Sequence, residues 1–84
     1  MPSLSQFYGI FIKMYFQQAE HNPPHIHAVY NSDVAEIDIR TGKVLEGQLP
    51  KKALSLVLEW LELHRGELLE LWETQEFREI EPLE

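Results

Sequence analysis

The feature that most constrains the fold is a change in hydrophobic periodicity at residue 51. Before it, apolar and charged residues alternate, as in 34–40, where Ala35, Ile37 and Ile39 point to one side and charged residues to the other. After it, apolar residues recur every three or four positions, which is the spacing of a helix face. Strands followed by helices are typical of an α+β domain.

The sequence predicts a single domain over residues 1–84. Its first part, about 7–46, is a small antiparallel β-meander of three to four strands, and its second part, about 50–78, is two helices packed on one face of the sheet. The predicted strands occupy residues 7–16, 25–30 and 34–40, with a short fourth strand at 44–46. Pro50 suits the first turn of a helix, and Gly66 marks the end of the first helix. The tail after residue 78 is expected to fray.

Charge is distributed unevenly along the chain. The net charge is −7, and residues 53–84 carry all of the excess, with nine glutamates against two arginines. This balance argues against duplex nucleic acid as a bulk electrostatic partner, because phosphate contacts need clustered lysine and arginine. The absence of cysteine and of any apolar run near the ~20 residues of a membrane span predicts a cytoplasmic protein with no membrane association.

The turn around Asn31 sets the register of the central hairpin. Pairing Tyr30 with Ala35 keeps the apolar residues of both strands on one face. The residues that then share the exposed face are His25, His27, Asp38 and Arg40. His27 becomes the cross-strand neighbour of Asp38, with Cβ atoms ~5 Å apart. We therefore expect this carboxylate to raise the pKa of His27.

Three of the four histidines lie within residues 21–27, HNPPHIH, and this motif has three interpretations. In the first, His25 and His27, two apart on one strand, bind a divalent cation such as zinc, with His21 or Asp38 as a third ligand. In the second, the face cleaves phosphodiester bonds without a metal. In the third, the prolines only shape a tight connection and the histidines fill a half-exposed strand face.

The catalytic interpretation assigns roles to individual residues. His27, oriented by Asp38, is the proton acceptor, and His25 or His21 is the donor. Arg40 and Lys13 stabilise the anionic transition state. The predicted substrate-binding residues are His21, Lys13 and Tyr15. The ligand for this face is then RNA.

The motif also carries a resemblance to a known family. The matching stretches are Pro2, Phe7-Tyr8-Gly9-Ile10, His21-x-Pro23-Pro24-His25-x-His27, Gly47 to Pro50, Glu59-Trp60, His64 and Trp72. With them the chain resembles the bacterial domain-of-unknown-function family numbered 4160. Some relatives are labelled DhiT-type toxins of type II toxin–antitoxin pairs. The resemblance implies a growth-inhibiting protein neutralised by a small antitoxin-like protein encoded nearby. The alternative is a non-catalytic module that binds a protein or a metal with the same face.

Overall fold

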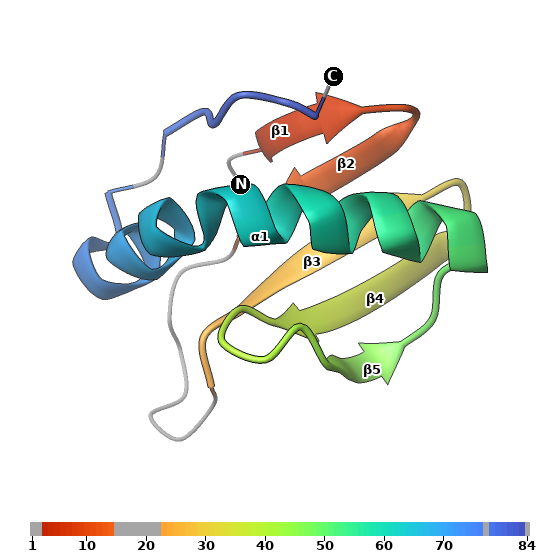
Figure 1. Cartoon of the computed structure of the whole chain (residues 1–84), viewed down its shortest axis with the longest axis horizontal. Coiled ribbons are helices and arrows are strands. Elements are labelled where there is room, and N and C mark those ends of the chain that lie inside the picture. Colours follow the sequence, from red (N-terminus) through yellow and green to blue (C-terminus); the bar gives the residue numbers. More distant parts are fainter. Residues whose placement is uncertain (1–2, 15–22, 77, 84) are drawn as a thin grey trace.

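The computed structural model describes residues 3–14, 23–76 and 78–83. Its elements are β1 (Ser3–Phe7), β2 (Ile10–Lys13), β3 (His25–Tyr30), β4 (Asp33–Asp38), β5 (Val44–Gly47) and α1 (Lys51–Thr74). The strands form one antiparallel sheet in sequence order, and α1 lies across one of its faces (Figure 1). The α+β class and the antiparallel meander are confirmed, whereas the numbers of strands and helices differ from the prediction.

The first difference is a hairpin over residues 3–13, where the sequence predicted a strand only from residue 7 onward, without a turn at residues 8–9. β1 ends at Phe7 and β2 starts at Ile10, so two residues form the turn. Tyr8 has φ 51° and Gly9 has φ 79°, and positive φ at both central residues is the requirement of a type I′ hairpin turn. The aromatic and β-branched run hides this turn in the sequence, because only the glycine signals it.

The second difference is the register between β3 and β4. Asn31, at φ 55°, and Ser32 form a two-residue loop, which pairs Tyr30 with Asp33. The predicted register assumed a loop two residues longer, so its pairs are wrong by two positions. A shift of two keeps every side chain on its predicted face. The residues buried on the core face of this hairpin are Ile26, Ala28, Ala35 and Ile37.

The predicted short fourth strand is confirmed as β5, the last strand of the sheet. Gly47 ends it at φ 78°, and a Cβ there would lie 2.0 Å from the carbonyl oxygen of Val34. Only glycine permits this close approach of two backbones. The resulting pairing sets Glu46 directly opposite Glu36.

A single 24-residue helix replaces the two predicted helices. The chain does leave helical geometry, but at His64 (φ −121°, ψ 18°) rather than at Gly66, and the helix resumes at once. The His64 Nδ1 lies 2.8 Å from a Glu67 carboxylate oxygen in the turn that follows. α1 is thus kinked at His64 but does not end there. Buried residues precede the kink (Val57, Trp60) and follow it (Leu68, Leu71).

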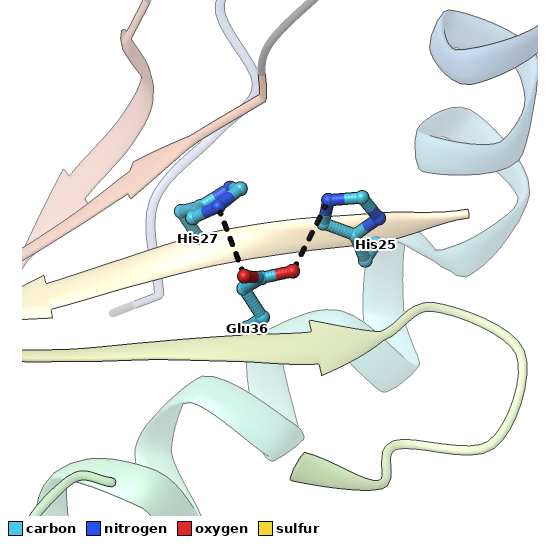
Figure 2. A group of neighbouring side chains, drawn as sticks. All are labelled: His25, His27 and Glu36. Carbon is cyan, nitrogen blue, oxygen red and sulfur yellow. Dashed lines mark ion pairs between the residues drawn. The ribbon is translucent and has the colours of Figure 1, made fainter. Parts of the chain in front are cut away.

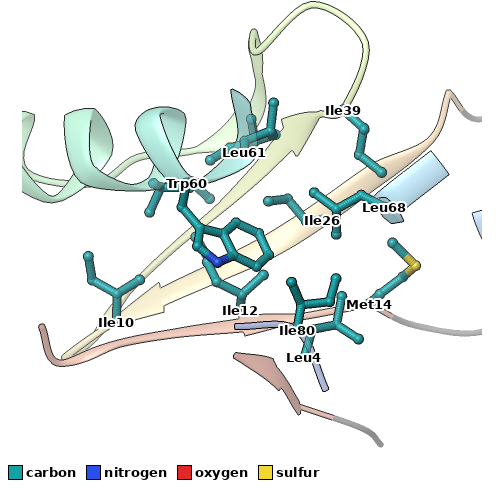
Figure 3. Close-up of a cluster of buried hydrophobic side chains, with 14 of the residues drawn as sticks. Leu4, Ile10, Ile12, Met14, Ile26, Ile39, Trp60, Leu61, Leu68 and Ile80 are labelled. Atoms are coloured by element: carbon teal, nitrogen blue, oxygen red, sulfur yellow. The ribbon is translucent and has the colours of Figure 1, made fainter. Parts of the chain in front are cut away.

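The core lies between α1 and the sheet. Trp60 is fully buried and points from α1 toward the strands, among the isoleucines of the sheet (Figure 3). The buried residues of the helix are Ala53, Val57, Trp60, Leu61, Leu68, Leu71 and Trp72. No helix in the described part of the chain is both long and apolar enough to cross a bilayer.

The segment of residues 78–83, which follows α1, packs against the domain, so the prediction of a frayed tail is wrong for these residues. It runs beside β1 (Figure 1), where the Ile80 N–H donates to the Leu4 carbonyl at 2.7 Å. Ile80 is only 4% exposed. The Trp60 Nε1–H donates to the Glu81 carbonyl at 2.7 Å, which fastens the tail to the helix.

Candidate metal site

Three side chains converge on the sheet face turned away from α1. His25 and His27 lie two residues apart on β3, and Glu36 of β4 is the cross-strand partner of His27. The Glu36 carboxylate lies between the two imidazoles (Figure 2), with one oxygen 3.4 Å from His25 Nε2 and the other 3.8 Å from His27 Nε2. One ligand atom of each residue lies within 4.8 Å of the other two.

His25 is held in one orientation by its neighbours. Its Nδ1 lies 2.9 Å from the Pro23 carbonyl oxygen. A carbonyl can only accept, so Nδ1 carries the proton and Nε2, which faces Glu36, is free to bind a proton or a metal. The Trp72 ring packs against the imidazole with centroids 5.1 Å apart, and the Pro24 carbonyl accepts a hydrogen bond from Ile39 N–H at 2.9 Å. The two prolines thus fix the approach to the site.

Burial controls the protonation of His27. Its side chain is 19% exposed. Burial lowers the pKa of His27 below its usual 6.5, the Glu36 carboxylate acts to raise it, and His25 lowers it further. The expectation that a neighbouring carboxylate raises this pKa is therefore wrong, because desolvation has the larger effect. A neutral imidazole is the form that binds metal ions.

The site is part of a row of polar residues that crosses four strands. Register pairs join Lys13 to His27, His27 to Glu36, and Glu36 to Glu46. A surface hollow of about 320 Å³ adjoins this row on the β5 side. It is lined by Pro23, His25, Glu36, Leu45 and Glu46. The cluster is therefore flanked by a cation on one side and a second carboxylate on the other.

Two residues predicted for this site do not reach the cluster. Asp38 is the register partner of His25, not of His27. Its carboxylate accepts hydrogen bonds from the N–H groups of Arg40, at 2.7 Å, and Thr41, at 3.1 Å, and so stabilises the loop after β4. Arg40 follows the end of β4 and is exposed. The two-residue shift in register explains both corrections.

The remaining predicted residues divide into two groups. Lys13 of β2 is the register partner of His27, so it lies beside the cluster. Tyr15 and His21 lie outside the described residues, so their roles as binding or metal-ligating groups stay predictions. Sequence reasoning missed Glu36 as a member of the cluster. A hairpin with the shortest loop, Asn31-Ser32, would have placed it opposite His27.

Two imidazoles and one carboxylate form a recognised set of metal ligands. His₂Glu sets bind zinc in hydrolytic enzymes, and two histidines with one carboxylate bind non-haem iron. Ligand atoms around tetrahedral zinc are about 3.3 Å apart, given bonds of about 2.0 Å. The ligand atoms of the cluster lie within 4.8 Å of one another, which is wider than this, so a bound zinc ion would draw the three side chains together.

Fold and site together define an α+β protein whose sheet is covered by a kinked helix on one face and carries a His₂Glu cluster on the other. The chain belongs to the family described as Domain of unknown function (DUF4160), which it matches over residues 9–73. That match includes the whole cluster. No curated protein and no solved structure matches the chain.

Proposed function

We propose that the protein is a metal-binding module that holds a divalent cation of the zinc class with His25, His27 and Glu36. The observation that carries this proposal is the convergence of one ligand atom from each residue within 4.8 Å. Nitrogen donors with a single carboxylate favour zinc and its transition-metal neighbours over magnesium or calcium, which prefer all-oxygen sites.

The surroundings support this function in two further ways. The bond from His25 Nδ1–H to the Pro23 carbonyl is the outer contact that orients metal-binding histidines. Burial keeps His27 neutral over a wider pH range, which reduces competition by protons. Both imidazoles turn Nε2 toward the Glu36 carboxylate.

Zinc titration followed by calorimetry tests the proposal. We expect one zinc per chain for the wild type, and a loss of affinity of about tenfold or more for His25→Ala, His27→Ala and Glu36→Gln. His64→Gln is the matched control, because His64 also contacts a glutamate but lies on the helix. A folded wild type that binds no zinc, or equal affinities in all four variants, would refute the proposal.

A second candidate function is cleavage of RNA by a toxin-like protein. Lys13 beside His27 supports it, because a cation next to an imidazole can stabilise a phosphorane-like transition state. Phe11, 38% exposed, lies two register positions away on β2, on the same face as Lys13, and offers a ring for base stacking. In this candidate Glu36 takes the orienting role predicted for Asp38, and Lys13 keeps the stabilising role that was predicted for it together with Arg40.

The two candidates differ in their response to a chelator. Metal-free acid–base cleavage of RNA persists in EDTA and is lost in both His27→Ala and Lys13→Gln. Growth inhibition on induced expression, relieved by co-expression of a small protein encoded beside it, would support the toxin role and its antitoxin-like partner. Intact RNA after incubation with the purified protein, together with unimpaired growth, would refute the candidate.

A further inference from the structure

We infer that Glu46 is the fourth ligand of the metal site, so that the bound cation is enclosed by protein and fastens the edge strand β5 to the sheet. This inference rests on the proposed metal-binding function of His25, His27 and Glu36. It adds Glu46 to the three proposed ligands and assigns the site to the structural class of zinc sites, in which the protein supplies all four ligands.

Strand pairing brings Glu46 to the site. It lies directly opposite Glu36 in the β4–β5 ladder, and residues in such pairs project from the same face with Cβ atoms about 5 Å apart. Both glutamates line the same hollow as His25. A glutamate side chain spans this distance, so the Glu46 carboxylate reaches a cation bound beside Glu36 by rotation alone.

The Glu46 side chain is also available. Its residue is exposed, and within the described parts of the chain its carboxylate takes part in no hydrogen bond or ion pair. Binding a metal would therefore break no existing interaction. Asp38 differs in this respect, since its carboxylate already holds the amides of the loop after β4.

Charge gives an independent reason for a cation at this position. Two glutamates directly opposite each other on neighbouring strands repel, which destabilises the pairing. A divalent cation between them replaces this repulsion with two attractions. Two carboxylates and two neutral imidazoles around a divalent ion form a site with no net charge, which is the least costly state for a partly buried centre.

A site with four protein ligands differs in function from one with three. Four ligands fill the tetrahedron of zinc and leave no position for water, as in structural zinc sites, whereas hydrolytic sites keep one position open. The ligands here come from β3, β4 and β5. The cation would thus hold three neighbouring strands together, including the short strand at the edge of the sheet.

Glu46→Gln tests the inference, with Glu73→Gln as the matched control for the loss of one exposed glutamate. Zinc affinity is measured by competition with a chromophoric chelator. Cobalt is used as the spectroscopic probe, because tetrahedral cobalt absorbs visible light much more strongly than cobalt with additional water ligands. We expect Glu46→Gln to lose about tenfold or more in zinc affinity and to change the cobalt spectrum. Glu73→Gln should match the wild type in both.

Two further measurements separate ligation from a folding defect. Without metal, Glu46→Gln should melt no lower than the wild type, because it removes a repulsive pair. With zinc, its melting temperature should rise less than that of the wild type. Glu46→His, which restores a zinc ligand of different chemistry, should recover affinity.

Three results of these measurements would overturn the inference. If Glu46→Gln binds zinc as tightly as the wild type with an unchanged cobalt spectrum, the inference is wrong and the site has three protein ligands. If Glu46→Gln binds weakly only because it melts lower without metal, the inference is also wrong. If the folded wild type itself binds no zinc, the proposed function fails and the inference fails with it.

Discussion

Replacing Trp60 with alanine should remove most of the stability of the domain. Trp60 is fully buried at the centre of α1 and packs against the Phe7 ring with centroids 5.6 Å apart. Its Nε1–H donates a hydrogen bond to the Glu81 carbonyl at 2.7 Å. The substitution therefore opens a cavity between helix and sheet and releases the tail.

The magnitude follows from these contacts. Truncating a buried tryptophan costs about 3–5 kcal/mol, and the lost hydrogen bond adds about 1 kcal/mol. At 0.05–0.15 kcal/mol per residue, a chain of this length has a free energy of unfolding of roughly 4–13 kcal/mol. The combined loss of about 4–6 kcal/mol would leave Trp60→Ala unfolded or close to it for a wild type in the lower half of this range. Trp60→Phe keeps most of the ring and loses the bond to Glu81, so it should cost about 1–3 kcal/mol.

Urea unfolding followed by circular dichroism measures these differences. Leu63→Ala is the control on the same helix, because Leu63 is 68% exposed and its truncation should cost less than about 0.5 kcal/mol. A Trp60→Ala variant within 1 kcal/mol of the wild type would show that the core does not depend on this side chain. The described packing of α1 on the sheet would then be incorrect.

Three further predictions concern the edge strand, the site and the tail. Gly47→Ala should lower the free energy of unfolding in urea by about 2–4 kcal/mol, because the new Cβ would clash with the Val34 carbonyl and φ is positive. An unchanged free energy of unfolding would contradict the close approach of the Gly47 and Val34 backbones. Because the pKa of His27 is lowered on folding, its stabilising contribution is complete above about pH 6.5 and is lost as pH falls below that value. In EDTA, the urea midpoint of the wild type should therefore fall more between pH 7.5 and 5.5 than that of His27→Gln, and parallel profiles would rule this out. Ile80→Ala should cost about 2–3 kcal/mol by the same assay, whereas a frayed tail would give no change.

Much of the fold could be predicted because it depends on periodicity. Alternation assigned the buried face of the central hairpin, and that assignment is unaffected by the error of two positions in register. The turn at Tyr8 and Gly9 was not predictable in this way, since a tyrosine at positive φ is uncommon and nothing else in the run interrupts an apolar strand. The kink in α1 is a similar case. Gly66 indicated an end to the helix, whereas the chain leaves helical geometry at His64 and α1 continues to Thr74, with buried residues on both sides of the kink.

The site was predicted in part for the same reason. His25 and His27 were identified because their two-residue spacing fixes a shared face whatever strand lies beside them. The cross-strand partner of His27 depends on the length of the loop between β3 and β4. The predicted loop was two residues too long, so it paired His27 with Asp38 where the structure has Glu36. The direction of the His27 pKa shift also depends on burial, which a strand pattern on an exposed face does not reveal.

The position of the tail has a consequence for self-association. The outer strands of an open sheet expose backbone groups that can pair with another chain and seed aggregation. Here the segment around Ile80 covers part of β1 by bonding to Leu4. The opposite edge, β5, has only four residues, carries Glu46 and is joined to β4 through an irregular register. Both borders of the sheet are thus poor templates for the addition of a strand from another chain.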